Sequence, residues 1–134
     1  MVVPDTSAWI EYFRRSGSST NLALRAVLAS DAVVAVTEGI VMELVAGARS
    51  SRERRDVLSL MRSFDLLPLH GVSDYEAAGD LYRACRAQGE TIRKMTDLLI
   101  AIPVIREGAE LLHNDADFDA IARHSDLRIY RGGN

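Results

Sequence analysis

Short apolar runs alternate with helix-patterned segments along the whole of this chain. The apolar runs are rich in Val, Ile and Leu and lie at residues 1–3, 32–36, 64–69, 110–113 and 127–130. Each of them is followed or preceded by a stretch in which apolar residues recur with helical spacing. Strands that alternate with helices in this way predict an α/β fold, in which a mostly parallel sheet carries helices on both faces.

Several local signals place the helices. Ser50–Glu53 and Ser73–Glu76 both match the capping box that opens a helix, and Gly89 is a typical stop for the second of these helices. The segment 96–102 begins with Thr and Asp and is then apolar nearly all round, which predicts a helix buried against the sheet. Pro103 lacks a backbone N–H, so we expect it to bend or split that helix.

Length and composition favour one domain, which we expect to span residues 1–131 with a flexible tail at 132–134. The uninterrupted apolar run 98–105 is far shorter than the roughly 20 residues that a membrane span needs, so we expect no membrane association. A lone Cys85 cannot form an internal disulfide, which is typical of a reducing compartment. These features together predict a cytoplasmic protein.

Acidic residues recur where the predicted strands end. Asp5 follows the first strand, and Asp115 and Asp117 follow the strand at 110–113. Glu43 lies on the helix after the second strand, and Asp97 lies in the first turn of the buried helix. Because ligands of open α/β sheets bind beyond the carboxyl ends of the strands, all five acids can reach one crevice.

Carboxylates that lie close together repel one another and raise one another's pKa unless a cation lies between them. Oxygen ligands without His or Cys at metal-binding spacing favour Mg²⁺, or Mn²⁺ as a substitute, over Zn²⁺. A second interpretation explains the same acids as helix caps, because Asp5, Asp97 and Asp115 all fall at helix starts. Spacing alone does not choose between the two. Glu43 by itself is typical of a solvated helix residue, and Asp119 of a surface charge.

The net charge of −3 does not by itself exclude a polyanionic substrate. If four of the 19 acids bind metal, the other 15 are balanced by 16 basic residues. All of these bases but one are Arg, whose planar guanidinium suits bidentate contacts with phosphate.

Four motifs together resemble the PIN domain of VapC-type toxins, and they occur in the family's order over nearly the whole chain. The motifs are Asp5-Thr6-Ser7-Ala8-Trp9, Glu43 followed by Leu44 and Gly47, Asp97-Leu98-Leu99-Ile100-Ala101, and Asn114-Asp115-Ala116-Asp117-Phe118. The resemblance implies a three-layer α/β/α sandwich whose mostly parallel sheet has about five strands. It also favours the metal interpretation of the acids over the capping one.

The same resemblance implies a Mg²⁺-dependent endoribonuclease that cuts structured RNA, often tRNA, and is inhibited by a cognate VapB antitoxin. It further implies a homodimer. Carried over by position, the catalytic acids are Asp5, Glu43, Asp97 and Asp115, and the metal ligands are Asp5, Asp97, Asp115 and Asp117. Thr6 is expected to support this site.

Two other functions remain as alternatives. A phosphoacceptor signalling domain also binds Mg²⁺ in an acidic pocket, but it needs a Lys after a late strand, and Lys94 precedes Asp97 in the chain. A catalytically silent PIN-like module would act through protein partners alone. A metal titration separates the silent module from the enzyme.

Overall fold

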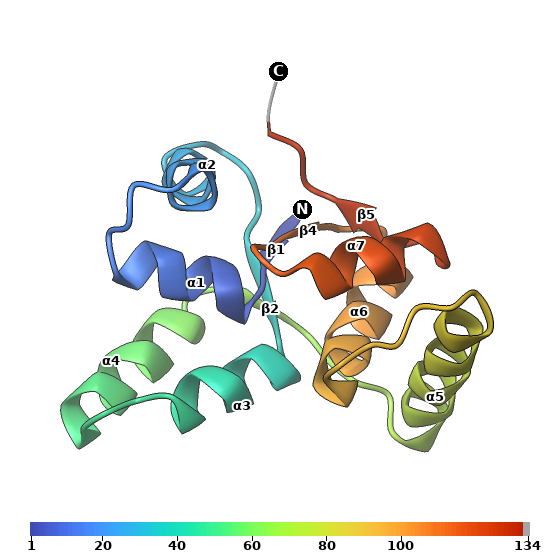
Figure 1. Ribbon diagram of the computed structural model, residues 1–134. Coiled ribbons are helices and arrows are strands. Elements are labelled where there is room, and N and C mark those ends of the chain that lie inside the picture. The colour runs from blue at the N-terminus through green and yellow to red at the C-terminus, as the bar shows by residue number, and fades with distance from the viewer. Residues whose placement is uncertain (133–134) are drawn as a thin grey trace.

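The computed structural model describes residues 1–132, in which strands and helices alternate as the sequence predicts (Figure 1). The strands are β1 (Val2–Pro4), β2 (Ala35–Thr37), β3 (Asp65–Leu67), β4 (Glu110–Leu112) and β5 (Arg128–Ile129). The helices are α1 (Thr6–Phe13), α2 (Ser19–Leu28), α3 (Glu38–Ala46), α4 (Ser51–Met61), α5 (Val72–Ala87), α6 (Met95–Glu107) and α7 (Ala116–Arg123). The tail expected at 132–134 lies, apart from Gly132, outside the described residues.

The strands pair in parallel and form two short ladders, one of β1, β4 and β5 and one of β2 and β3. An isolated parallel bridge between Val2 and Val34 joins the ladders, and the Val2 N–H donates to the Val33 carbonyl at 2.9 Å. The strand order across the molecule is therefore β3, β2, β1, β4, β5. The expected parallel sheet of about five strands is confirmed, although its two halves meet through this single bridge.

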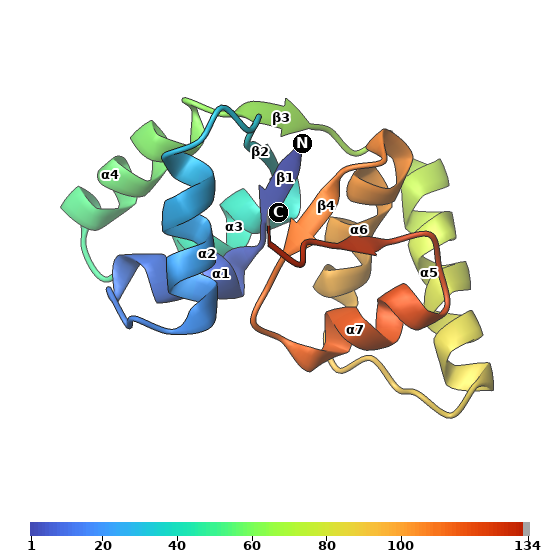
Figure 2. The same cartoon turned by 90° about the horizontal axis from the view of Figure 1, so that it is seen from above.

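Helices pack on both sides of the strands, which gives the expected α/β sandwich (Figures 1 and 2). The apolar core fills the space between them, and its largest fully buried side chains include Trp9, Leu98, Ile100, Leu111 and Phe118. Burying a side chain of this size stabilises a fold by roughly 1.5–3 kcal/mol. None of the helices in residues 1–132 is long and apolar enough to cross a membrane.

The chain order places a topological switch point between β1 and β4. From β1 the chain moves to β2 and β3 on one side and later returns to β4 and β5 on the other. Pro4 lies opposite Leu112 at the ends of the two strands, and the Asp5 N–H donates to the Leu112 carbonyl at 3.0 Å. Segments that leave neighbouring strands in opposite directions open a crevice there, which is where such folds bind ligands.

One local prediction is wrong, and the split that was one of the two outcomes expected at Pro103 does not occur. The capping box expected at Ser73–Glu76 does not form, because α5 begins at Val72 after Gly71, and Asp74 instead accepts from the His70 N–H at 2.7 Å and pairs with Arg106. Helix α6 is not split at Pro103, which is buried within it. The box at Ser50 does form in part, since the Ser50 hydroxyl accepts from the Glu53 N–H at 3.0 Å.

Candidate active site

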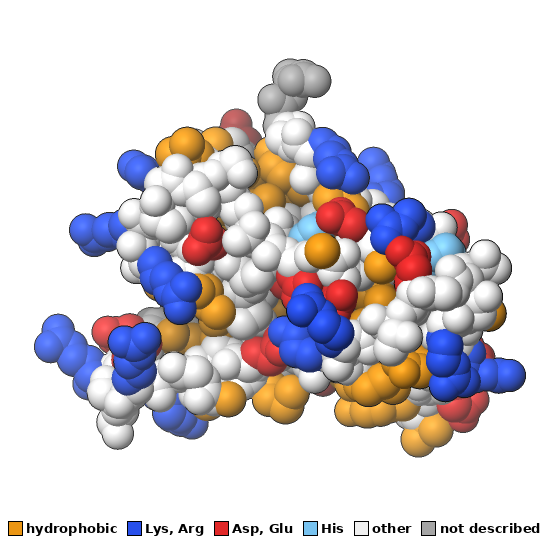
Figure 3. All heavy atoms as spheres, in the orientation of Figure 1, with side chains coloured by type: hydrophobic (Ala, Val, Ile, Leu, Met, Phe, Trp, Pro, Cys, Tyr) orange, Lys and Arg blue, Asp and Glu red, His pale blue; other side chains and the backbone are white. Residues whose placement is uncertain are grey.

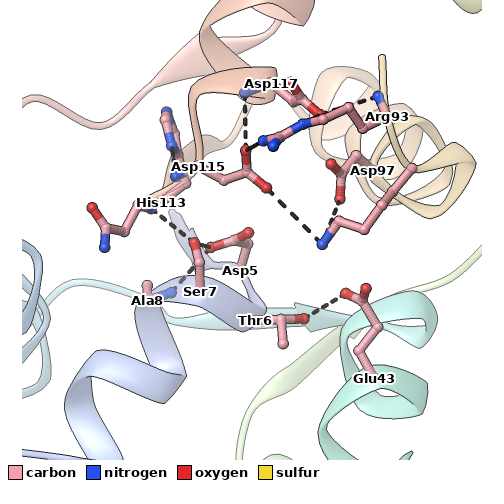
Figure 4. Close-up of polar contacts among 12 residues, drawn as sticks. Asp5, Thr6, Ser7, Ala8, Glu43, Arg93, Asp97, His113, Asp115 and Asp117 are labelled. Atoms are coloured by element: carbon pink, nitrogen blue, oxygen red, sulfur yellow. Dashed lines mark hydrogen bonds and ion pairs between the residues drawn. The ribbon is translucent and has the colours of Figure 1, made fainter.

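The five predicted acids converge on the crevice beyond β1 and β4 (Figure 4). Asp5 is the N-cap of α1, and Asp115 is the N-cap of α7 with Asp117 in its first turn. Glu43 comes from α3, and Asp97 comes from the first turn of α6. In the space-filling view, acidic side chains gather in the hollow at the centre of this face, with basic side chains against them (Figure 3).

Asp97 is the most buried acid of the group, with a relative exposure of 1%. Its Oδ2 atom has no hydrogen-bond partner among the described residues. Burial, together with the nearby carboxylates of Asp115, Glu43 and Asp5, raises the pKa of Asp97 to about 7, although the Lys94 ammonium lowers it. A buried carboxylate oxygen without a partner is costly, so it marks a place for a cation.

Asp5 is held by the start of its own helix. One oxygen, Oδ1, accepts from the Ala8 N–H at 3.1 Å and from the Ser7 hydroxyl at 2.6 Å. Burial raises the pKa of Asp5 to about 6, although these hydrogen bonds lower it. The Ser7 hydroxyl also accepts from the Asn114 N–H at 2.8 Å, which ties the start of α1 to the segment after β4.

Asp97, Asp115 and Asp117 form a compact group, in which one carboxylate oxygen of each lies within 4.8 Å of the others. The backbone positions two of them, because Asp115 Oδ1 accepts from the Asp117 N–H at 3.0 Å. Three carboxylates so close, one of them with an unpartnered buried oxygen, offer the all-oxygen donor set that Mg²⁺ and Mn²⁺ prefer. The residues therefore fit a divalent ion.

Glu43 lies across the crevice from this group and is held by Thr6 (Figure 4). The Thr6 hydroxyl donates to Glu43 Oε1 at 2.6 Å, which joins α1 to α3. Thr6 is expected to support the site, and the group that its hydroxyl contacts is the Glu43 carboxylate. Glu43 is half-buried on α3, so this contact sets it apart from a side chain that meets solvent alone.

Two of the acids both cap a helix and belong to the acidic cluster. Asp5 and Asp115 both accept from backbone N–H groups at helix starts, as the capping interpretation requires. Asp97 does not, because the N-cap of α6 is Lys94 and no side chain caps this helix. Capping therefore fails to explain the most buried acid of the group.

Two basic residues in the crevice were not predicted from the sequence. Lys94 Nζ lies 3.9 Å from Asp97 Oδ1 and 4.0 Å from Asp115 Oδ2. The Arg93 guanidinium contacts Asp117 Oδ2 at 3.2 Å and Asp115 Oδ1 at 3.4 Å. Lys94 therefore lies in the acidic pocket, but it comes directly before α6 and not after a late strand, where a phosphoacceptor domain needs its Lys. The sequence did contain a signal for these two residues, because Arg93 and Lys94 come just before the predicted helix start at Thr96-Asp97.

His113, directly after β4, and Asp119, on α7, support the same crevice. His113 Nδ1 accepts from the Asp115 N–H at 3.0 Å, and its Nε2 lies 3.2 Å from Asp119 Oδ1. The interpretation of Asp119 as a surface charge alone is wrong, because it orients the ring that holds the Asp115 backbone.

A sequence model of the PIN domain matches residues 2–124. The chain belongs to the PIN-domain family. Within this family it is similar to Ribonuclease VapC11 of Mycobacterium tuberculosis, with 41% identity over 129 residues that cover 96% of each protein. The match places it in the VapC branch of PIN domains, as the motifs at Asp5, Glu43, Asp97 and Asp115 indicate.

Solved structures confirm the PIN fold. VapBC-1 from nontypeable Haemophilus influenzae superposes with a TM-score of 0.74 at 21% identity, covering 97% of each chain. VapC20 of Mycobacterium tuberculosis, described as a Sarcin-Ricin loop cleaving toxin, has a TM-score of 0.68 at 16% identity and covers 96% of this chain and 99% of its own. At these identities the likeness is one of fold.

Proposed function

We propose that this PIN domain, acting as one unit over residues 1–131, is a Mg²⁺-dependent endoribonuclease toxin that cuts structured RNA, with tRNA as the first candidate. The observation that carries the proposal is the buried, unpartnered Oδ2 of Asp97 within the group it forms with Asp115 and Asp117. The similarity to Ribonuclease VapC11 along nearly the whole chain supports the reaction type.

In this proposal, Asp97, Asp115 and Asp117 hold the divalent ion. Asp5, which the sequence also predicts as a ligand, is not one of this compact group and completes the acidic wall beside it. A divalent ion bound there would lower the pKa of a water molecule and would offset the negative charge that develops on the phosphate. Glu43 accepts a proton from the attacking water, and the Thr6 hydroxyl keeps its carboxylate pointed into the crevice. Asp119 and His113 act through the Asp115 backbone and fix where that carboxylate lies.

The direct test incubates the purified protein with total RNA, which contains both tRNA and ribosomal RNA, and maps the new 5′ ends. We expect discrete cuts with Mg²⁺ or Mn²⁺, none with EDTA, and none from the Asp97→Asn variant. Asp31→Asn is the matched control, because Asp31 is exposed in the turn between α2 and β2. Cutting that survives chelation contradicts the metal role, and absence of cutting under every condition favours the silent binding module.

The proposed partner is a VapB-type antitoxin, because the structural relatives include the VapBC-1 complex. We propose that an antitoxin segment enters the acidic crevice through a basic side chain, since the carboxylates there attract cations. We further propose that the toxin is a homodimer in the cytoplasm. Co-expression with a VapB-type antitoxin, followed by a metal titration of the complex, tests the mode of inhibition. An inhibited complex that still binds metal freely contradicts it.

A further inference from the structure

The segment between α5 and α6, residues 88–94, brings two cations onto the acidic group of Asp97, Asp115 and Asp117 (Figure 4). Lys94 lies 3.9–4.0 Å from oxygens of Asp97 and Asp115, and Arg93 lies 3.2–3.4 Å from oxygens of Asp117 and Asp115. Every carboxylate of the group is thus paired with a cation of this one segment.

The segment is also anchored through its backbone and through a second ion-pair cluster. The Arg93 N–H donates to Asp117 Oδ2 at 3.2 Å, in addition to the guanidinium contact. Further back in the segment, Glu90 pairs with Arg123 and His124 at the end of α7. The segment therefore bridges both ends of α7, and one of its two attachments is made of the carboxylates that are proposed to bind metal.

A divalent ion and this cation pair need the same oxygen atoms. Arg93 and Lys94 contact Oδ1 and Oδ2 of Asp115, Oδ2 of Asp117 and Oδ1 of Asp97, while Asp97 Oδ2 is left without a partner. An ion that entered through Asp97 Oδ2 would lie close to both positive side chains and be repelled by them. The Arg93 and Lys94 side chains are 73% and 55% exposed, so they can move out into solvent.

We propose that Arg93 and Lys94 form a built-in counter-cation pair, which neutralises the acidic group before metal binds and must be displaced when it does. This inference rests on the proposed metal site. The pair lowers the apparent affinity of the site for divalent ions, and metal binding detaches the Arg93–Lys94 end of segment 88–94 from α7. The site therefore binds Mg²⁺ only when the concentration of free Mg²⁺ is high.

The first test measures Mg²⁺ and Mn²⁺ binding by calorimetry for the parent and for Lys94→Met, Arg93→Met and the double variant. We expect Lys94→Met to bind the ion about fivefold more tightly or more. Two unit charges 4 Å apart in water repel by ~1 kcal/mol, and removing that repulsion corresponds to about this ratio of dissociation constants. The double variant should bind more tightly still, and Lys94→Arg should stay close to the parent. Arg83→Met is the matched control for net charge, because Arg83 is exposed and pairs with Asp80 on its own helix.

The outcomes separate this inference from the proposed function. A parent that binds no divalent ion overturns both. A parent that binds metal with an affinity that Lys94→Met and Arg93→Met leave unchanged or weaken overturns only the competition. An equal gain in Arg83→Met also overturns it, because the effect would then be one of net charge.

The second test uses hydrogen exchange of backbone amides, with saturating Mg²⁺ against EDTA. We expect exchange in residues 90–94, including the Arg93 amide that donates to Asp117 in the metal-free site, to become faster when metal binds, while α7 is protected. Ordinary stabilisation by a bound ligand slows exchange throughout the site, so slower exchange in this segment contradicts the release.

Discussion

At the scale of single residues, the site depends on what surrounds each carboxylate. Asp5 and Asp115 are stabilised by backbone N–H groups at helix starts, so they remain ordered as carboxylates without metal. Asp97 has no such donor and keeps one buried oxygen unpaired. The electrostatic cost of the cluster is therefore concentrated at Asp97, and the proposed divalent ion would relieve it.

Replacing Asp97 with Asn removes the charge and keeps the shape. Because Asp97 is buried among like charges, we expect the metal-free Asp97→Asn variant to melt at a higher temperature than the parent, while cleavage and stabilisation by Mg²⁺ are lost. Thermal melts in EDTA and in Mg²⁺, with Asp31→Asn beside them, measure this. A variant that melts lower yet cuts RNA at the parental rate would show Asp97 to be structural.

The contact between Thr6 and Glu43 makes a second prediction at this scale. Thr6→Val removes the hydroxyl that donates to Glu43 Oε1 but keeps the side-chain volume. If Thr6 positions Glu43, kcat should fall roughly tenfold or more with little change in KM or metal affinity. Thr6→Ser keeps the hydroxyl and should restore most of the rate. Equal losses in both variants would mean that the Thr6 methyl, and not its hydroxyl, matters.

At the scale of secondary-structure elements, the crevice depends on how closely α3 and α6 approach, because they carry Glu43 and Asp97. The two helices pack together where α3 has Gly39. A Cβ atom at Gly39 would lie 3.1 Å from Cγ1 of Ile100, which is fully buried on α6. The absence of a side chain at Gly39 therefore sets the spacing of these helices, as a close helix contact requires.

Two Gly→Ala variants test this spacing. In an unhindered helix, Gly→Ala stabilises by about 0.5–1 kcal/mol, and Gly79 on α5 has open space where an added methyl group would lie, so Gly79→Ala should gain that amount. Gly39→Ala should instead lose roughly 1 kcal/mol, because its methyl group would crowd Ile100, which is fully buried on α6. Urea unfolding of both variants gives the two free energies. A stabilised Gly39→Ala would show that α3 and α6 can separate freely.

At the scale of the whole molecule, the acidic site affects global stability through pH. The pKa values of Asp5 and Asp97 are raised to about 6 and about 7, above the value near 3.9 in an unfolded chain. Their contribution to stability is complete below about pH 4 and is lost as pH rises through 6 and 7, because the folded state holds these protons more tightly. Asp74, whose pKa Arg106 lowers, acts in the opposite sense and loses its contribution only as pH falls below about 4.

The metal-free protein should therefore become less stable between about pH 4.5 and pH 7.5. Thermal melts in EDTA across this range should show a falling midpoint, with roughly 3–6 °C lost for each kcal/mol. Saturating Mg²⁺ should remove most of this fall in the melting midpoint at neutral pH. In EDTA, the midpoint of Asp97→Asn should depend less on pH than that of the parent. A midpoint that rises steadily up to neutral pH in EDTA would contradict the raised pKa values.

The alternation of strands and helices, the parallel sheet and the acids at strand ends follow from the sequence, because apolar periodicity and helix starts are local properties. The PIN motifs likewise predict Asp5, Glu43, Asp97 and Asp115 as site residues from their order in the chain, and the structure brings these four together. Local patterns also misled, since the expected capping box at Ser73 gave way to an ion pair between Asp74 and Arg106 on another helix.

Tertiary structure alone decided which side chains contact one another in the crevice. The contacts of Thr6 with Glu43 and of Arg93 with Asp117 join residues 37 and 24 positions apart, and no local pattern reports such pairs. Lys94 differs, because it is close to Asp97 in sequence, yet its contact with Asp115 forms only when β4 and α6 are assembled. Burial of Asp97, and with it the raised pKa and the unpaired oxygen, likewise exists only in the packed molecule, since desolvation depends on neighbours that the chain supplies from several elements.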